Sequence, residues 1–115
     1  MKSLKSSLAM FILMGAGLLV AGTRFQAAPP PDGAALYKQK CAMCHGADGK
    51  GYAAIKTPDL TDPKWQKNAK DKDIEDAIKN GKKGTAMPAF ADKLKDDEAK
   101  ALVAYIRSLD SSKKK

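Results

Sequence analysis

Histidine and cysteine are scarce in this chain of 115 residues, which contains one histidine and two cysteines. A structural zinc site usually takes four cysteine or histidine ligands, so these three residues could not complete one without carboxylates. Aromatic residues make up only 6% of the chain and are not interleaved with its basic residues, which argues against nucleic acid as a partner. Alternation of apolar and polar residues is also missing, so β-strands are not expected.

The scarce residues lie together in one run, Cys41-Ala42-Met43-Cys44-His45. The pattern C-x-x-C-H is typical of a c-type haem attachment site. Each thiol can add across one vinyl group of the porphyrin, and the histidine that follows lies close enough to ligate the iron. We therefore expect one haem c, attached covalently through Cys41 and Cys44 and ligated by His45.

Three other interpretations of this run remain open. A thioredoxin-like redox pair requires a strand–helix–strand context, and no such pattern surrounds residues 41–45. A zinc site would need carboxylate ligands as well. A structural disulfide between Cys41 and Cys44 would leave His45 without a role. A haem accounts for all three residues, and it is the interpretation that we favour.

The first 28 residues have the features of a secretory signal peptide. Lys2 and Lys5 give a basic start, and residues 8–22 form an almost unbroken apolar run that is shorter than a comfortable membrane span. We expect export with cleavage near Ala28. The alternative is an uncleaved N-terminal anchor, since the cleavage site is poor, and membrane contact is expected only through such an anchor. In both cases the folded part is expected in the periplasm.

The rest of the chain divides into a proline-rich spacer over residues 29–32, a domain over residues 33–110 and a basic tail over residues 111–115. The domain has fewer than 80 residues, which is marginal for an independent hydrophobic core. A bound haem would supply the missing apolar surface. We therefore expect the chain without haem to be largely unfolded.

Apolar periodicity and stop signals predict three helices, over residues 33–40, 71–80 and 96–109. The first of them runs directly into the haem motif. The glycine- and proline-rich segments 46–64 and 81–90 are predicted to be loops. The expected fold class is therefore all-α, with three to four short helices and loops wrapped around one covalent haem.

An iron held by one histidine has an open sixth position, and the residue that fills it decides the chemistry. Two methionines remain after export, Met43 and Met87. Met43 is part of the haem motif, on the side of the ring that the histidine occupies, and cannot reach the other face. A lone methionine more often fills a gap in a core. Met87, however, precedes Pro88 in an irregular segment, and we expect its sulfur to be the second axial ligand beside His45.

Five stretches of the chain match a family pattern in order and spacing: Gly33 with Tyr37, Cys41-Ala42-Met43-Cys44-His45, Thr57-Pro58-Asp59-Leu60, Met87-Pro88-Ala89-Phe90 and Leu102-Val103-Ala104-Tyr105-Ile106-Arg107. Together they resemble a class I c-type cytochrome, a small α-helical domain built around one haem, over residues 33–109. The resemblance implies that the Pro58 carbonyl accepts a hydrogen bond from His45 and orients its ring. It also implies axial ligation by Met87. Trp65 is a candidate donor to a haem propionate or, equally, an aromatic cover for the haem edge.

The expected function is electron transfer, with iron cycling between Fe(II) and Fe(III) and with no catalytic residue or enzymatic activity. The net charge of +8 falls to +5 when the three basic residues of the first 28 are removed. A modestly basic surface suits redox partners with acidic docking surfaces. Four loop lysines are expected around the haem edge: Lys50, Lys56, Lys82 and Lys83.

The protein is expected to be a monomer that exchanges electrons with periplasmic or membrane partners. One alternative is a haem enzyme or gas sensor with a labile sixth ligand, although the chain has no second histidine to act as a distal base. Another is a redox or zinc module without haem. Binding of carbon monoxide by the reduced protein distinguishes the first alternative, and a colourless protein would indicate the second.

Overall fold

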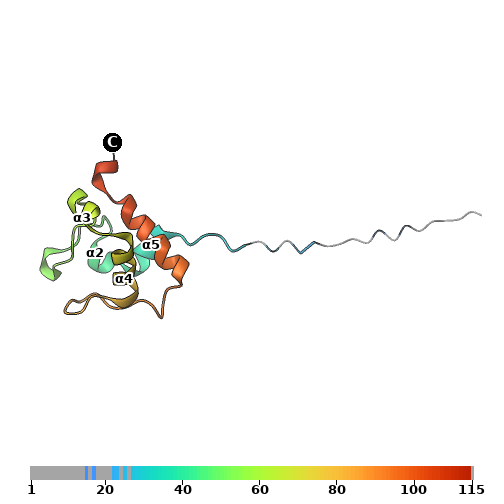
Figure 1. Ribbon diagram of the computed structural model, residues 1–115, viewed down its shortest axis with the longest axis horizontal. Helices are drawn as coiled ribbons and strands as arrows, with labels where there is room; N and C mark the ends of the chain where they lie inside the picture. The colour runs from blue at the N-terminus through green and yellow to red at the C-terminus, as the bar shows by residue number, and fades with distance from the viewer. Residues whose placement is uncertain (1–14, 16, 18–21, 24, 26, 115) are drawn as a thin grey trace, which may run out of the picture.

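The computed structural model describes residues 15, 17, 22, 23, 25 and 27–114. The predicted signal peptide or anchor falls largely outside these residues and stays a prediction. No helix in the described part is long and apolar enough to cross a bilayer. Residues 27–32, which include the proline-rich spacer, have no regular secondary structure and lead away from the helical domain (Figure 1).

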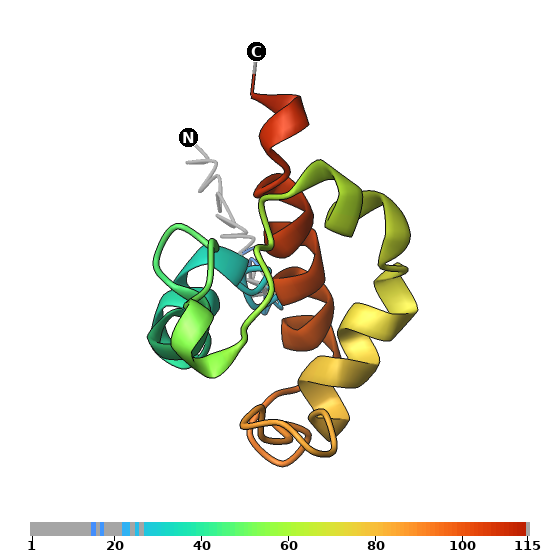
Figure 2. The ribbon, with the colours of Figure 1, turned by 90° about the vertical axis from the view of Figure 1, so that its left-hand side faces the viewer.

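The described residues form helices and loops and contain no strand, which confirms the expected all-α class. Figure 2 shows α5 in the middle of the domain, with α2 and α4 on either side of it. The elements are, in chain order, α1 (Gly33–Lys40), α2 (Ala42–His45), the 3₁₀ turn η1 (Ala53–Ile55), α3 (Pro63–Asn68), α4 (Asp71–Asn80), α5 (Asp96–Ser108) and the 3₁₀ turn η2 (Ser111–Lys113).

Helix α1 begins where the sequence predicts because Asp32 caps it. The Asp32 carboxylate accepts hydrogen bonds from the backbone N–H groups of residues 34 and 35, at 3.0 and 3.2 Å. The helix then crosses α5 at close range. A Cβ placed on Gly33 would lie 2.3 Å from the carbonyl oxygen of Ala101, so only glycine fits at the crossing. One turn later, the ring of Tyr37 packs on that of Tyr105 with 5.0 Å between centroids.

Helix α3 is the main difference from the sequence analysis, which placed a loop over residues 46–64. The sequence predicts Pro63 to be a loop residue, but in the structure it is the first residue of the helix, a position whose N–H has no partner within the helix. Asp62 caps this helix and accepts a hydrogen bond from the N–H of Lys64 at 3.0 Å. The sequence Asp-Pro is therefore a helix start here, and the loop ends at residue 62.

Helices α4 and α5 have nearly the predicted bounds and pack against each other, because both present apolar side chains to the core. The Nζ atom of Lys79 on α4 lies 2.8 Å from carboxylate oxygens of both Glu75 and Asp96, which adds an ion pair between the two helices. The buried core consists of Tyr37, Leu60, Ile74, Ile78, Leu94, Ala99, Leu102, Val103, Ile106 and Leu109.

The predicted basic tail begins as an ordered turn. Residues 111–113 form η2, and Asp110 accepts a hydrogen bond from the N–H of Ser112 at 2.9 Å. The N–H of Ser111 donates to the carbonyl oxygen of Thr61, also at 2.9 Å. The start of the tail is thus hydrogen-bonded to the segment that precedes α3.

Candidate haem site

The C-x-x-C-H run lies at the junction of α1 and α2. Cys41 occupies this junction, and its carbonyl oxygen accepts hydrogen bonds from the N–H groups of Cys44 (3.1 Å) and His45 (2.9 Å). The spacing places the two thiols one helical turn apart, which is the separation that brings side chains together on one helix face. Both cysteines are half-buried free thiols. Burial raises the pKa of the Cys41 thiol to about 11.

His45, at the end of α2, carries a buried polar atom that nothing satisfies. Its Nδ1 atom has no hydrogen-bond partner, and a buried unpaired polar atom carries a desolvation penalty. Burial also lowers the pKa of the imidazole, which favours the neutral form that ligates metals. The ring is therefore suited to ligation through one nitrogen, and the other nitrogen lacks the acceptor that usually fixes the orientation of such a ring.

The predicted acceptor, the carbonyl of Pro58, lies in a loop that folds back toward His45. The N–H of Gly51 donates to the carbonyl oxygen of His45 at 2.8 Å. A Cβ on Gly51, whose φ is +73°, would lie 2.7 Å from the carbonyl oxygen of Thr57 and 2.8 Å from that of Pro58. Glycine at residue 51 thus allows this close approach. The hydrogen bond from His45 to Pro58 is not formed in this structure, and it stays a prediction.

Tyr37 is a residue whose contact with this site the sequence analysis missed. Its side chain is 1% exposed, and its hydroxyl donates a 2.7 Å hydrogen bond to the carbonyl oxygen of Gly46, the residue that ends α2. Burial raises the pKa of Tyr37, so the phenol stays protonated and remains a donor. The sequence assigned Tyr37 only to the crossing with α5. A tyrosine at a core position predicts a hydrogen-bond partner for its hydroxyl, and this was the signal in the sequence that could have indicated the contact.

Met87 lies in the irregular segment 81–90, as predicted, and this segment is tied to the end of α4. The carbonyl oxygen of Met87 accepts a hydrogen bond from the N–H of Lys82 (3.3 Å), and the N–H of Met87 donates to Thr85 Oγ1 (3.3 Å). The N–H of Phe90 donates to the carbonyl of Ile78 in α4 at 3.0 Å. Met87 itself is half-buried and packs against the core. Its role as a ligand stays a prediction.

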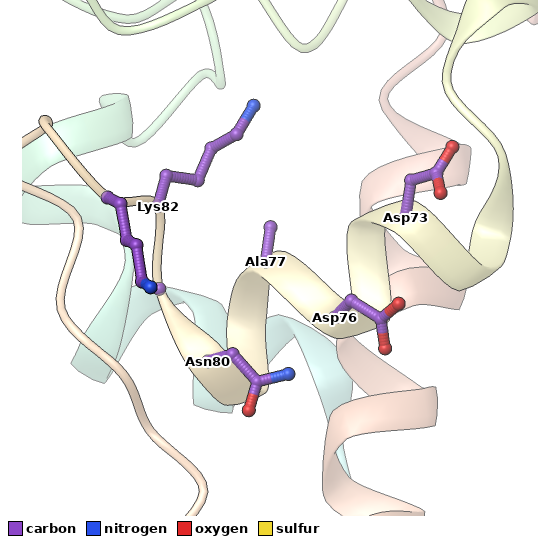
Figure 3. A pocket seen from close by; sticks show the side chains of 7 residues that line it. Asp73, Asp76, Ala77, Asn80 and Lys82 are labelled. Atoms are coloured by element: carbon purple, nitrogen blue, oxygen red, sulfur yellow. The ribbon is translucent and has the colours of Figure 1, made fainter.

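The remaining candidates lie at the surface or the edge of the core. Trp65 on α3 is half-buried against the core, and its proposed contact with a haem propionate stays a prediction. The four loop lysines are all exposed. Two of them, Lys82 and Lys83, line an open hollow of about 430 Å³ that runs along α4 and just past its end, together with Asp73 and Asp76 (Figure 3). None of the predicted haem ligands lines this hollow.

The donor set fits a covalently attached haem. Two half-buried thiols and a neutral imidazole lie in one short helix and its N-cap residue, and the imidazole has a buried nitrogen without a partner. Large apolar side chains also stay exposed in and after the motif, with Met43 85%, Tyr52 50% and Ile55 46% exposed. Among the described residues, no group of three or more His, Cys, Asp or Glu side chains could hold a metal ion by itself.

This chain matches a known protein family. The model of the family described as cytochrome C oxidase, cbb3-type, subunit III matches residues 28–106. The FixP subunit of the cbb3-type cytochrome c oxidase of Rhizobium meliloti (strain 1021) is 36% identical over 77 residues, which are 67% of this chain and 26% of that protein. The FixP subunit of Bradyrhizobium sp. (strain ORS 278) is 33% identical over 81 residues, 70% of this chain and 28% of its own length. The chain thus spans little more than a quarter of these relatives.

Solved structures give the same fold. The KustC0563 c-type cytochrome has a TM-score of 0.64 and 34% identity, and the match covers 69% of this chain and 98% of that one. Cytochrome cL from Hyphomicrobium denitrificans has a TM-score of 0.56 and 32% identity over 68% of this chain and 45% of its own. A domain of the dihydro-heme d1 dehydrogenase NirN is also similar, with a TM-score of 0.59 and 38% identity over 66% of this chain and 16% of NirN.

Proposed function

This chain belongs to the family of cbb3-type cytochrome c oxidase subunit III and is a class I c-type cytochrome domain, and from that premise we propose that it transfers electrons through one covalently bound haem c. When bound, the haem supplies an iron that alternates between Fe(II) and Fe(III). The observation that carries the proposal is the placement of two free thiols and a neutral, partly buried imidazole in one short helix and its N-cap residue.

In this proposal Cys41 and Cys44 anchor the haem through thioether bonds, and His45 ligates the iron. Because both anchors and the ligand belong to one helical segment, the imidazole approaches from a fixed side. Tyr37 holds the end of that segment through its bond to Gly46. The neutral form of the imidazole, favoured by burial, leaves a nitrogen lone pair free for the metal.

Met87 is proposed as the second axial ligand. Its backbone is held on both sides by hydrogen bonds within the 81–90 segment, which gives the side chain a fixed point of attachment. A histidine and a methionine that both stay bound in the two oxidation states leave the protein little to rearrange during transfer. This ligand pair also raises the potential. Both properties suit an electron carrier better than a gas-binding site.

We further propose a monomeric carrier in the periplasm, exported or held by its N-terminal segment, that docks on redox proteins with acidic surfaces. The exposed Lys50, Lys56, Lys82 and Lys83 support this charge preference. The relatives are named as subunits of cbb3-type cytochrome c oxidases, which supports a redox protein as the partner. The likeness to a domain of NirN, an enzyme, keeps a haem enzyme as the second candidate.

Production in a host that attaches haem covalently tests the proposal. We expect the mass of the purified protein to increase by one haem, and we expect this increase to be lost when Cys41 and Cys44 are both replaced by serine. We expect reduced wild-type protein not to bind carbon monoxide, and we expect Met87→Ala to bind it and to have a lower midpoint potential. Met43→Ala, at an exposed methionine of the motif, is the control and should behave as wild type.

Two results would contradict the proposal. If Met87→Ala has the wild-type spectrum and midpoint, Met87 is not a ligand. If the reduced wild-type protein binds carbon monoxide rapidly, the sixth position is open and the haem enzyme or sensor is favoured.

A further inference from the structure

Gln66 on α3 is the one amide or charged residue that is buried in the described part of the chain, with 6% of its surface exposed. Its Nε2 atom donates two hydrogen bonds, to the carbonyl oxygens of Leu60 at 2.6 Å and Ile106 at 2.8 Å. Its Oε1 atom accepts a hydrogen bond from Arg107 Nη1 at 3.1 Å. The amide therefore joins the end of the Thr57–Leu60 loop to α5.

Arg107 strengthens the same junction from α5. Its Nη1 atom also donates to the backbone carbonyl of Gln66 at 2.5 Å, and its Nη2 atom donates to the carbonyl of Ala69. Its Nε atom donates to Asp71 at 2.6 Å. The guanidinium thus satisfies carbonyls at the end of α3 and pairs with the first residue of α4. Gln66 is held in place by this arrangement and cannot easily turn away from Leu60.

Leu60 is bound on both sides. Its carbonyl accepts from Gln66, its N–H donates to the carbonyl of Gly49 at 2.8 Å, and its side chain is 3% exposed. Pro58 lies two residues before it, in the loop that approaches Gly51 and thus His45. The carbonyl of Pro58 therefore lies two residues before a position that Gln66 holds.

We propose that Gln66 is a positioning residue for the haem ligand: it holds the Thr57–Leu60 loop near His45, so that in the haem-loaded protein the Pro58 carbonyl accepts the hydrogen bond from His45 Nδ1–H that is not formed in this structure. The inference rests on the proposed function, in which His45 binds the iron. A histidine whose Nδ1–H is hydrogen-bonded is a more basic ligand and stabilises Fe(III). Loss of the Gln66 amide therefore raises the midpoint potential and frees the Nδ1–H proton to exchange.

The test uses the haem-loaded protein with the substitution Gln66→Met, which keeps the side-chain length and removes both donors. Nuclear magnetic resonance of protein with ¹⁵N-labelled histidine measures the exchange of the His45 Nδ1–H, and a redox titration measures the midpoint. We expect exchange to become about tenfold faster or more, as for the loss of a buried hydrogen bond, and the midpoint to rise.

Two control variants separate positioning from stability. Lys67→Met changes the exposed neighbour on the same helix and should leave both readouts at the wild-type values. Asp71→Asn removes the ion pair to Arg107 but keeps the Gln66 amide. It should lower the melting temperature and leave the midpoint and the exchange rate unchanged.

Gln66→Met with the wild-type midpoint and exchange rate overturns the inference, even if its melting temperature falls. If this variant cannot be produced, hydrogen exchange is measured in the wild-type protein. Slow exchange of the Gln66 side-chain amide protons supports the inference, and fast exchange overturns it. If the wild-type protein shows no signal from an iron-bound histidine, the proposed ligation by His45 is wrong. This result separates failure of the proposed function from failure of the inference about Gln66 alone.

Discussion

Replacement of Tyr37 by phenylalanine removes a single hydroxyl from the support of the haem helix. This hydroxyl donates to the carbonyl of Gly46 at 2.7 Å, and both residues are buried, so water cannot replace the lost donor. A buried carbonyl left without its partner costs about 1–2 kcal/mol. In a domain of this size each kcal/mol lowers the melting temperature by roughly 4–8 °C. We expect the melting temperature of haem-loaded Tyr37→Phe to fall by roughly 5–15 °C.

Thermal unfolding followed by circular dichroism in the haem absorption band measures this effect at the site itself. Tyr105→Phe is the matched control, because the ring of Tyr105 packs on the same partner and its hydroxyl makes no hydrogen bond to another described residue. The control should change the melting temperature little. An unchanged melting temperature in Tyr37→Phe, or an equal fall in both variants, would refute the assignment of a supporting role to the bond with Gly46.

Three further predictions follow from the structure. Because burial raises the pKa of Tyr37 above its usual value near 10, the folded state holds the phenol proton more tightly than the unfolded state. The contribution of Tyr37 to the free energy of unfolding should therefore be fully present below pH 10 and decrease above it, by at most about 1.4 kcal/mol per pH unit. In denaturant titrations at alkaline pH, Tyr37→Phe should lack this part of the decrease. An equal dependence of stability on pH in both proteins would contradict the prediction. Gly33→Ala should lower the free energy of unfolding by roughly 1–3 kcal/mol or more, since its methyl would lie 2.3 Å from the Ala101 carbonyl oxygen. If urea unfolding gives the variant the same stability as wild type, the two helices cross less closely than described. Electron transfer to an acidic partner should slow steeply with added salt, and less steeply in the double variant Lys82→Gln/Lys83→Gln; a flat salt response in stopped-flow kinetics would exclude these lysines from docking.

Local patterns predicted most of the helices because their causes are local. Asp32 caps α1, and the apolar faces of α4 and α5 repeat with the helical period, so the bounds of these helices follow from neighbours in the sequence. The loop over residues 81–90 followed in the same way from glycine and proline. Helix α3 did not, because Asp-Pro is a signal both for a loop and for a helix start; in the structure Arg107, which is distant in sequence, donates hydrogen bonds to the carbonyl oxygens of Gln66 and Ala69.

The family and the candidate ligands were also accessible from the sequence, since C-x-x-C-H places two thiols and an imidazole on one helical turn wherever that turn lies. The supporting contacts were not. The bond from Tyr37 to Gly46 spans nine residues, and the bond from Gln66 to Ile106 spans 40. No periodic pattern encodes such a pairing, because it depends on the angle at which two helices cross.

The sequence by itself therefore determined the chemistry of this protein: which residues can anchor and ligate a haem, and which segments become helices. Only the tertiary structure decided how that chemistry is held, through the close crossing of α1 on α5 and the buried amide of Gln66. The reason is physical. Ligand type and helix propensity are properties of neighbouring residues, whereas the alignment of a hydrogen bond depends on distances between segments that only the packed core fixes.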